Sequence, residues 1–340
     1  MRTFLLILLL AALPVVDGQA DTVDVYTGEA AVENKDADER KRALPLSLHH
    51  VLQKVSGLRS FEDYPLVDAA LGQASSILVS FYYQNLADTL ADGSVSDQLM
   101  LVAKFSAVEV DEMVRTLGLP LWPSERAPVD AWVVVDDGLD RRIMPVEFAY
   151  AWQSMAEVAE RRGLPVNWPS PDAEGNFPVD AQLLWGGYTE DLGVDSGRGA
   201  LIMAARREGM EWGVRSNMTY GSQSWTWRVQ DIDLQLALTE SLQLAVDQVA
   251  AANTIAAADL GAWMHQLTVS GLRNADDYER CLSYLQDIGV VEDVSVISAT
   301  PGLVIFRLQL SALPRYLEET LLGGRVLGFD ENEAQYFLLR

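Results

Sequence analysis

Cysteine, histidine and lysine are scarce in this chain of 340 residues. It has one cysteine and three histidines, so an internal disulfide framework is excluded, and we expect neither a cysteine–histidine zinc site nor another cofactor. Lys plus Arg number 25 against 49 Asp plus Glu, which gives a formal net charge of −24 and a pI of about 4.4. Such a chain repels phosphate backbones, so it is not expected to bind nucleic acid.

Long hydrophobic runs are missing after the first twenty residues. Within residues 1–20 a short basic start, Met1–Thr3, precedes an apolar run from Phe4 to Val16, and small residues follow at Gly18 and Ala20. These are the parts of a secretory signal peptide, too short for the ~30 Å hydrocarbon core of a membrane. We therefore expect cleavage after residue 20, export to a bacterial periplasm and no transmembrane segment in the mature chain.

Familiar catalytic motifs are also missing. The sequence contains no Gly-x-x-x-x-Gly-Lys-Ser/Thr loop, no Gly-x-Ser-x-Gly elbow and no Gly-x-Gly-x-x-Gly fingerprint. These absences argue against the common nucleotide-binding enzymes, hydrolases and dinucleotide enzymes, and we expect a protein without catalytic activity.

What the chain does contain is a hydrophobic content of 49%, enough for a sizeable core. Alternating and helical patterns predict an α+β fold made of several modules, each combining a mixed or antiparallel sheet with helices. After the signal peptide, the expected boundaries enclose an N-terminal α+β domain at 21–125, a middle domain with a β-meander and a long helix at 126–255, and a C-terminal βαββα-like domain at 256–340.

The first expected helix has clear start and stop signals. Asp36 and Glu39 have the spacing of a capping box, an apolar stripe runs from Leu44 to Val55, and Gly57 fits the stop position. Pro45 falls inside this pattern, which predicts that the helix either begins near it or kinks there.

One ten-residue motif occurs twice. Residues 55–64 match residues 269–278 at seven of ten positions, and each copy is followed by the pattern of a helix, two strands and a further helix. The first copy follows a helix, whereas the second lies on an expected strand. Both a duplicated helix–strand–strand–helix unit and a coincidence remain open.

A group of aspartates follows the expected buried strand 129–135. Asp136, Asp137 and Asp140 are a candidate Mg²⁺ or Ca²⁺ site, because carboxylates at a strand end are typical ligands of hard cations. The alternative is that Asp136, Asp137 and Gly138 simply turn the chain, as Asp and Gly commonly do.

Aromatic residues gather on the expected β-meander. Trp212, Tyr220, Trp225 and Trp227 are candidates for an aromatic platform that binds a glycan or another ligand, and the alternative is packing of the sheet against the long helix 231–252. The basic residues of the same region favour an anionic partner surface; they are Arg206, Arg207, Arg215 and Arg228.

Three segments resemble a family of secreted proteobacterial proteins, domain of unknown function 2066. The resemblance is carried by Val25–Gly57, by the strand Trp132–Gly138 and by Arg162–Pro165. It implies the exported compartment and the overall class, and it implies no activity, ligand or catalytic residue.

These observations favour a non-catalytic interaction or scaffold protein of the cell envelope, whose partner is another envelope protein or a glycan. The alternative is a glycan- or small-ligand-binding protein that uses the aromatic platform. A third hypothesis is a metal-dependent hydrolase at Asp136, Asp137 and Asp140.

Overall fold

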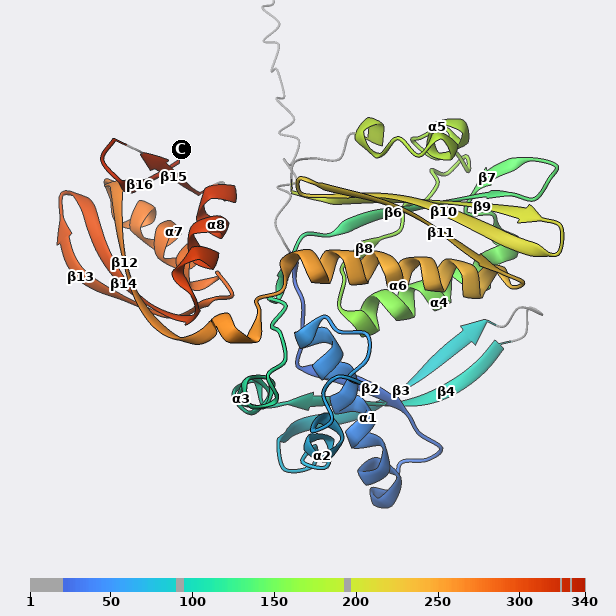
Figure 1. Ribbon diagram of the computed structural model, residues 1–340, viewed down its shortest axis with the longest axis horizontal. Helices are drawn as coiled ribbons and strands as arrows, with labels where there is room; N and C mark the ends of the chain where they lie inside the picture. Colours follow the sequence, from blue (N-terminus) through green and yellow to red (C-terminus); the bar gives the residue numbers. More distant parts are fainter. Residues whose placement is uncertain (1–20, 90–94, 193–196, 325, 331, 340) are drawn as a thin grey trace, which may run out of the picture.

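The computed structural model describes residues 21–89, 95–192, 197–324, 326–330 and 332–339. The predicted signal peptide, residues 1–20, lies outside these ranges. The predicted α+β class is confirmed, since helices pack on three larger sheets of mixed or antiparallel pairing (Figure 1). Within the described ranges no helix combines the length and the apolar character needed to cross a membrane.

The N-terminal module is a three-stranded antiparallel sheet in the order β2-β4-β3, with α1 packed against it. A short pair, β1 (Asp21–Thr22) with β5 (Glu125–Arg126), lies outside this sheet. The elements of the module are β2 (Thr27–Ala31), α1 (Ala37–Ser56), α2 (Val67–Leu71), β3 (Leu78–Thr89), β4 (Val95–Phe105) and α3 (Ala107–Leu117).

Helix α1 carries the predicted apolar stripe into the core of this module. It ends at Gly57, whose φ of 70° is the left-handed conformation of a helix stop. The helix begins eight residues before Pro45, so Pro45 lies inside it rather than at its start. The predicted capping box is wrong: the Asp36 side chain makes no cap bond, and Glu39 Oε1 instead accepts the backbone N–H of Glu33 at 3.0 Å.

The middle module is a six-stranded sheet in the order β11-β10-β9-β6-β7, with β8 beside β6. Helices α4 and α6 cover one face, and α5 lies over the other (Figure 1). The elements are β6 (Val129–Asp136), β7 (Arg141–Ile143), η1 (Val146–Phe148), α4 (Ala149–Arg162), β8 (Val166–Asn167), α5 (Ala181–Gly186), η2 (Thr189–Leu192), β9 (Gly199–Glu208), β10 (Glu211–Tyr220), β11 (Gln223–Asp231) and α6 (Leu234–Asn253).

The C-terminal module is a five-stranded sheet in the order β13-β14-β12-β16-β15. Its core includes Cys281, which is fully buried; burial raises the pKa of this thiol to about 12. The elements are η3 (Ala257–Asp259), β12 (Leu260–Leu272), α7 (Ala275–Gln286), β13 (Val291–Thr300), β14 (Gly302–Ala312), α8 (Pro314–Gly323), β15 (Leu327–Asp330) and β16 (Gln335–Leu338).

The N-terminal and C-terminal modules share one topology. Each runs strand, helix, strand, strand, helix, and its first strand pairs with its third, which also pairs with its second. The two copies of the ten-residue motif, however, begin on different elements: Val55 lies in α1, whereas Val269 lies in β12. The strand order is therefore repeated, while the sequence motif does not mark equivalent positions.

Two buried arginines join the N-terminal module to the middle module. Arg126, 1% exposed, donates to the backbone oxygens of Lys54 and Gly163 at 2.7 and 2.5 Å, and these oxygens lie at the C-terminal ends of α1 and α4. Arg162 donates to the Gly57 oxygen at 3.0 Å and pairs with Asp247 of α6 at 2.7 Å. Because carbonyl groups at helix C-termini carry partial negative charge, these guanidinium groups stabilise the junction.

Candidate functional site

The aspartates predicted as metal ligands form the turn between β6 and β7. Asp136 Oδ1 accepts the N–H of Gly138 at 3.0 Å, and Asp137 Oδ1 accepts the N–H groups of Leu139 and Asp140 at 2.9 and 3.1 Å. Asp140 in turn accepts the N–H of Arg141 at 2.7 Å. This is the bonding of a turn, the structural alternative stated above.

The remaining carboxylate oxygens of this turn face arginines. Asp136 Oδ2 pairs with Arg141 at 3.2 Å and Arg206 at 3.1 Å, and Asp137 Oδ2 pairs with Arg142 at 3.0 Å. Within the described residues, no group of three or more acidic, histidine or cysteine side chains is placed to hold a metal. The arrangement gives no support to the proposed cation site.

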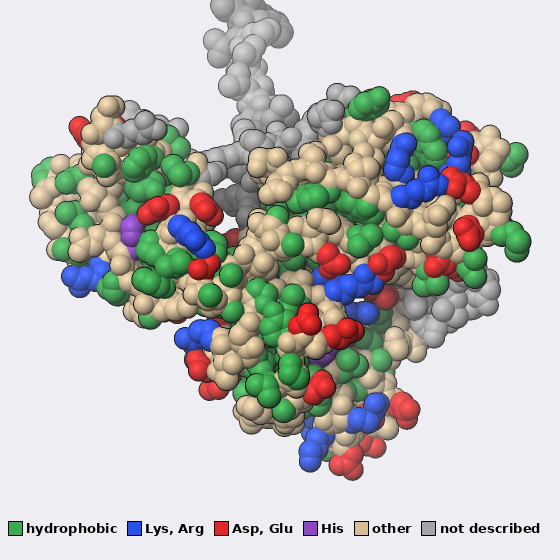
Figure 2. Space-filling model, in the orientation of Figure 1, with side chains coloured by type: hydrophobic (Ala, Val, Ile, Leu, Met, Phe, Trp, Pro, Cys, Tyr) green, Lys and Arg blue, Asp and Glu red, His purple; other side chains and the backbone are tan. Residues whose placement is uncertain are grey.

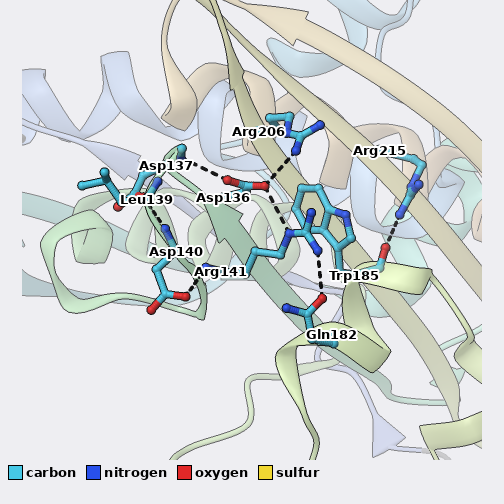
Figure 3. A network of polar contacts seen from close by, with 10 residues as sticks. Asp136, Asp137, Leu139, Asp140, Arg141, Gln182, Trp185, Arg206 and Arg215 are labelled. Atoms are coloured by element: carbon cyan, nitrogen blue, oxygen red, sulfur yellow. Dashed lines mark hydrogen bonds and ion pairs between the residues drawn. The ribbon is translucent and has the colours of Figure 1, made fainter.

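Three arginines surround the ring of Trp185 next to this turn (Figure 3). The guanidinium carbons of Arg141, Arg206 and Arg215 lie 4.5, 5.6 and 6.0 Å from the ring centroid. We call these four residues the arginine–tryptophan cluster. Cation–π attraction between a guanidinium and an indole ring stabilises such an arrangement.

The topology of the middle sheet brings the cluster together. Asp136 of β6 is opposite Arg141 of β7 on one side and Arg206 of β9 on the other, and Arg215 follows on β10. Helix α5 lies over this face and supplies Trp185, whose backbone oxygen accepts a hydrogen bond from Arg215. Gln182 of the same helix accepts from Arg141 at 2.8 Å. Each guanidinium is thus held in place by a neighbour.

The cluster carries more positive than negative charge. Asp136, which is 7% exposed, pairs with Arg141 and Arg206, whereas Arg215 forms no ion pair among the described residues. Partial burial acts to raise the pKa of Asp136, but the hydrogen bonds from Gly138 and Arg141 and the charge of Arg206 hold this pKa below its ordinary value. With Asp136 ionised, the three guanidinium groups of the cluster exceed this carboxylate by two charges. The adjoining turn adds Asp137, which pairs with Arg142, and Asp140. Figure 2 shows basic side chains gathered on this part of the middle module.

An open cavity of about 840 Å³ borders the cluster along β7. Arg141 and Arg142 line it on the sheet side, and Trp152, Trp168 and Phe177 supply aromatic walls together with several prolines. Strand β7 is the last strand at this edge of the sheet, so its outer side borders the cavity. The site therefore combines a basic end with an apolar groove beside a short edge strand.

The four predicted platform residues lie on the opposite, helix-covered face. Trp212, 7% exposed, stacks edge-on with Phe148, and Tyr220 donates to the oxygen of Ala127 at 3.2 Å. Trp225 and Trp227 pack on the core under α6, and Trp227 Nε1 donates to Ser241 at 3.0 Å. This placement favours the packing alternative over a ligand platform.

Sequence reasoning missed Trp185 and Arg141 as site residues. Of the four cluster residues, it singled out only Arg206 and Arg215, as basic residues of a partner surface. The period-two alternation of β9 and β10 places these two arginines on one face. Helix α5 packs over the same face and places Trp185 beside these arginines, and no local sequence pattern predicts this packing.

The comparisons with known proteins give a partial family match and no activity. No curated protein matches the chain. One solved structure, described only as "Crystal structure of uncharacterized protein", is similar at 10% identity over 37% of this chain and 88% of that chain, with a TM-score of 0.17. Residues 20–123, less than half of the chain, match a family described as a domain of unknown function (DUF8605). This match supports a domain of unknown function in that segment but not the particular family that the sequence resemblance suggested.

Proposed function

We propose that this protein is a non-catalytic binding protein of the bacterial cell envelope, and that the arginine–tryptophan cluster binds an acidic segment of another envelope protein. The observation that carries the proposal is the convergence of Arg141, Arg206 and Arg215 on Trp185, where Asp136 pairs with the first two and Arg215 forms no ion pair among the described residues. Elsewhere the chain is strongly acidic, with a formal net charge of −24.

The chemistry of these side chains suits a protein partner. Arginine presents a planar fork of N–H donors that matches a carboxylate, and arginine and tryptophan are the residue types enriched where binding energy concentrates in interfaces. The adjoining groove beside β7 offers aromatic walls to apolar residues of the same segment. A glycan on the meander aromatics is less favoured, because those rings pack against the core.

The compartment and the finer family relationship belong to the same proposal. Residues 1–20 have the composition of a signal peptide, and export would place the cluster among envelope proteins. The similarity of Val25–Gly57 and Trp132–Gly138 to domain of unknown function 2066 supports the same compartment.

The proposal is tested by titrating the mature chain with a labelled peptide of alternating Glu and Val residues and following fluorescence anisotropy. Each lost charge-assisted hydrogen bond is worth about 1.5 kcal/mol or more. The double variant Arg206→Ala/Arg215→Ala is therefore expected to weaken binding about 10- to 100-fold.

Two matched controls separate this surface from general charge effects. Arg42→Ala lies on α1, where Arg42 pairs with Glu39 at 2.6 Å. Arg115→Ala lies on α3, where Arg115 pairs with Glu112 at 2.7 Å. Both are expected to change the affinity less than about threefold. Equal losses in all three variants, or no binding by the unmodified protein, would refute the proposal.

A further inference from the structure

A second cavity lies where the N-terminal module meets the middle module. Its volume is about 380 Å³, within the range of pockets that hold small molecules. Residues of β2, α1, β3 and β4 line one side, and the C-terminal end of α4 with the following Leu164 and Pro165 lines the other. The cavity therefore exists only because the two modules are joined.

A buried lysine occupies one wall of this cavity. Lys54 lies in the last turn of α1 and is 7% exposed. Its ammonium group donates one hydrogen bond, to the backbone oxygen of Thr27 at 3.0 Å, out of three that it can make. No carboxylate of the described residues lies within ion-pair distance of it. Its two remaining N–H groups can donate to an anionic group that a ligand brings.

The carboxylates of Glu29 and Glu160 stand on the other walls, beyond ion-pair distance of Lys54 but close enough for its charge to act on them. Within the described ranges neither Glu29 nor Glu160 forms an ion pair, and Glu29 accepts only an uncharged hydrogen bond, from Gln84 at 3.2 Å. Burial and the charge of Glu160 raise the pKa of Glu29, and the charges of Lys54 and Arg161 partly offset this rise. Asp24 also lines the cavity, but Lys104 lies 3.7 Å from it. Glu29 and Glu160 are thus placed to accept a positively charged group.

A zwitterion is the one class of ligand that meets both requirements. A purely cationic amine would be repelled by Lys54, and a simple carboxylate would be repelled by Glu29 and Glu160. The remaining wall, which includes Val23, Val102 and Leu164, is apolar and suits a short aliphatic body. We infer that this cavity binds a small amino acid, with the ligand carboxylate at Lys54 and its ammonium group at Glu29 and Glu160.

The experiment measures binding to the mature full chain by isothermal titration calorimetry. The probes are L-alanine, D-alanine and γ-aminobutyrate. Butylamine and butyrate, the two halves of γ-aminobutyrate, carry only its ammonium group or only its carboxylate. At least one amino acid is expected to bind with a Kd of about 1 mM or below, and each half at least 10-fold more weakly. Failure of all three amino acids to bind at 10-fold higher concentration (about 10 mM) would overturn the inference.

Variants assign the two ends of the ligand. Glu160→Gln, at an exposed position of α4, is expected to weaken amino-acid binding about 10-fold and to leave butyrate binding no weaker. Lys54→Met is expected to bind γ-aminobutyrate no more tightly than butylamine. Lys41→Met on the exposed side of α1 is the matched control and is expected to bind like the unmodified protein.

The variant outcomes are decisive in either direction. If Lys54→Met does not fold, Glu160→Gln still tests the site, and unchanged amino-acid binding in Glu160→Gln would contradict the inference. The arginine–tryptophan cluster lies outside this cavity, so the result does not depend on the proposed protein partner.

Discussion

At the module junction, a single side chain can hydrogen-bond backbone groups from several segments of the chain. Among the described residues no carboxylate forms an ion pair with the buried Arg126, and burial lowers the pKa of its guanidinium to about 9. Besides Lys54 and Gly163, it donates to the oxygens of Pro123 and Trp122 at 2.8 and 3.1 Å, and its guanidinium lies 3.6 Å from the Trp122 ring centroid. One side chain thus satisfies carbonyl groups from both modules and from the segment between them.

Replacing Arg126 is therefore expected to be costly. Arg126→Met leaves several buried carbonyl groups without donors, and we expect the free energy of unfolding to fall by about 3–5 kcal/mol. Arg315→Met removes an exposed arginine paired with Asp259 and is expected to cost less than about 1 kcal/mol. Chemical denaturation of the two variants measures the difference, and similar losses would show that Arg126 has no special role.

His50 gives the fold a dependence on pH. The Nδ1–H of His50 donates to the backbone oxygen of Glu29 at 2.7 Å. Burial lowers the pKa of His50 to about 4 in the folded protein, against about 6.5 for an exposed histidine. Between these values the unfolded chain binds a proton that the folded chain does not. The contribution of the buried, neutral His50 to the free energy of unfolding is therefore complete above about pH 6.5 and is lost as the pH falls toward 4.

The pH effect is isolated by comparing variants. Between pH 7.5 and 5, the unmodified protein is expected to lose about 1–2 kcal/mol more unfolding free energy than His50→Gln. His50→Asn, which also removes the titrating ring, is expected to show the same pH slope as His50→Gln. Identical slopes in all three proteins would contradict this assignment.

At the scale of elements, β2 packs unusually closely on α1. A Cβ added at Gly28 would lie 2.0 Å from the backbone oxygen of Ser47, and this oxygen belongs to a helix that cannot yield locally. Gly28→Ala is expected to lower the unfolding free energy by about 2 kcal/mol or more because strand and helix must separate. At Gly261 the nearest atom to an added Cβ is 3.4 Å away, so Gly261→Ala is the control. Thermal or denaturant unfolding compares them, and equal stability would show that β2 and α1 tolerate the shift.

Most elements could be predicted from the sequence, because their signals are local. The stripe from Leu44 to Val55, the stop at Gly57 and the alternation along β9 and β10 each depend on a few neighbouring residues. The capping box at Asp36 failed because Glu39 turns to Glu33 and Arg42 instead. A spacing permits such a bond, but the surrounding partners decide whether it forms.

At the scale of the whole molecule, the sites depend on contacts between distant segments. The arginine–tryptophan cluster needs α5 folded over β9 and β10, and the Lys54 cavity needs α4 beside α1. The alternation of each strand is readable in the sequence, but sheet order and module packing are not. This is why Arg206 and Arg215 could be singled out while Trp185 and Lys54 could not.

Export of the whole molecule remains a prediction from residues 1–20. We expect the protein in the periplasmic fraction with an N-terminus at Asp21, because Gly18 and Ala20 suit signal-peptidase cleavage. N-terminal sequencing of the purified protein measures this. A sequence that still begins at Met1 would contradict the proposed compartment.

The most direct test of the binding surface is a charge-swap experiment in the intact envelope. A photoreactive residue at Gln182, beside Arg141, is expected to cross-link one partner, and Arg206→Glu/Arg215→Glu is expected to abolish that cross-link. Arginines substituted for the acidic residues of the identified partner are then expected to restore it. Cross-linking that persists in the charge-reversed variant, or that is not restored by the swap, would contradict the account.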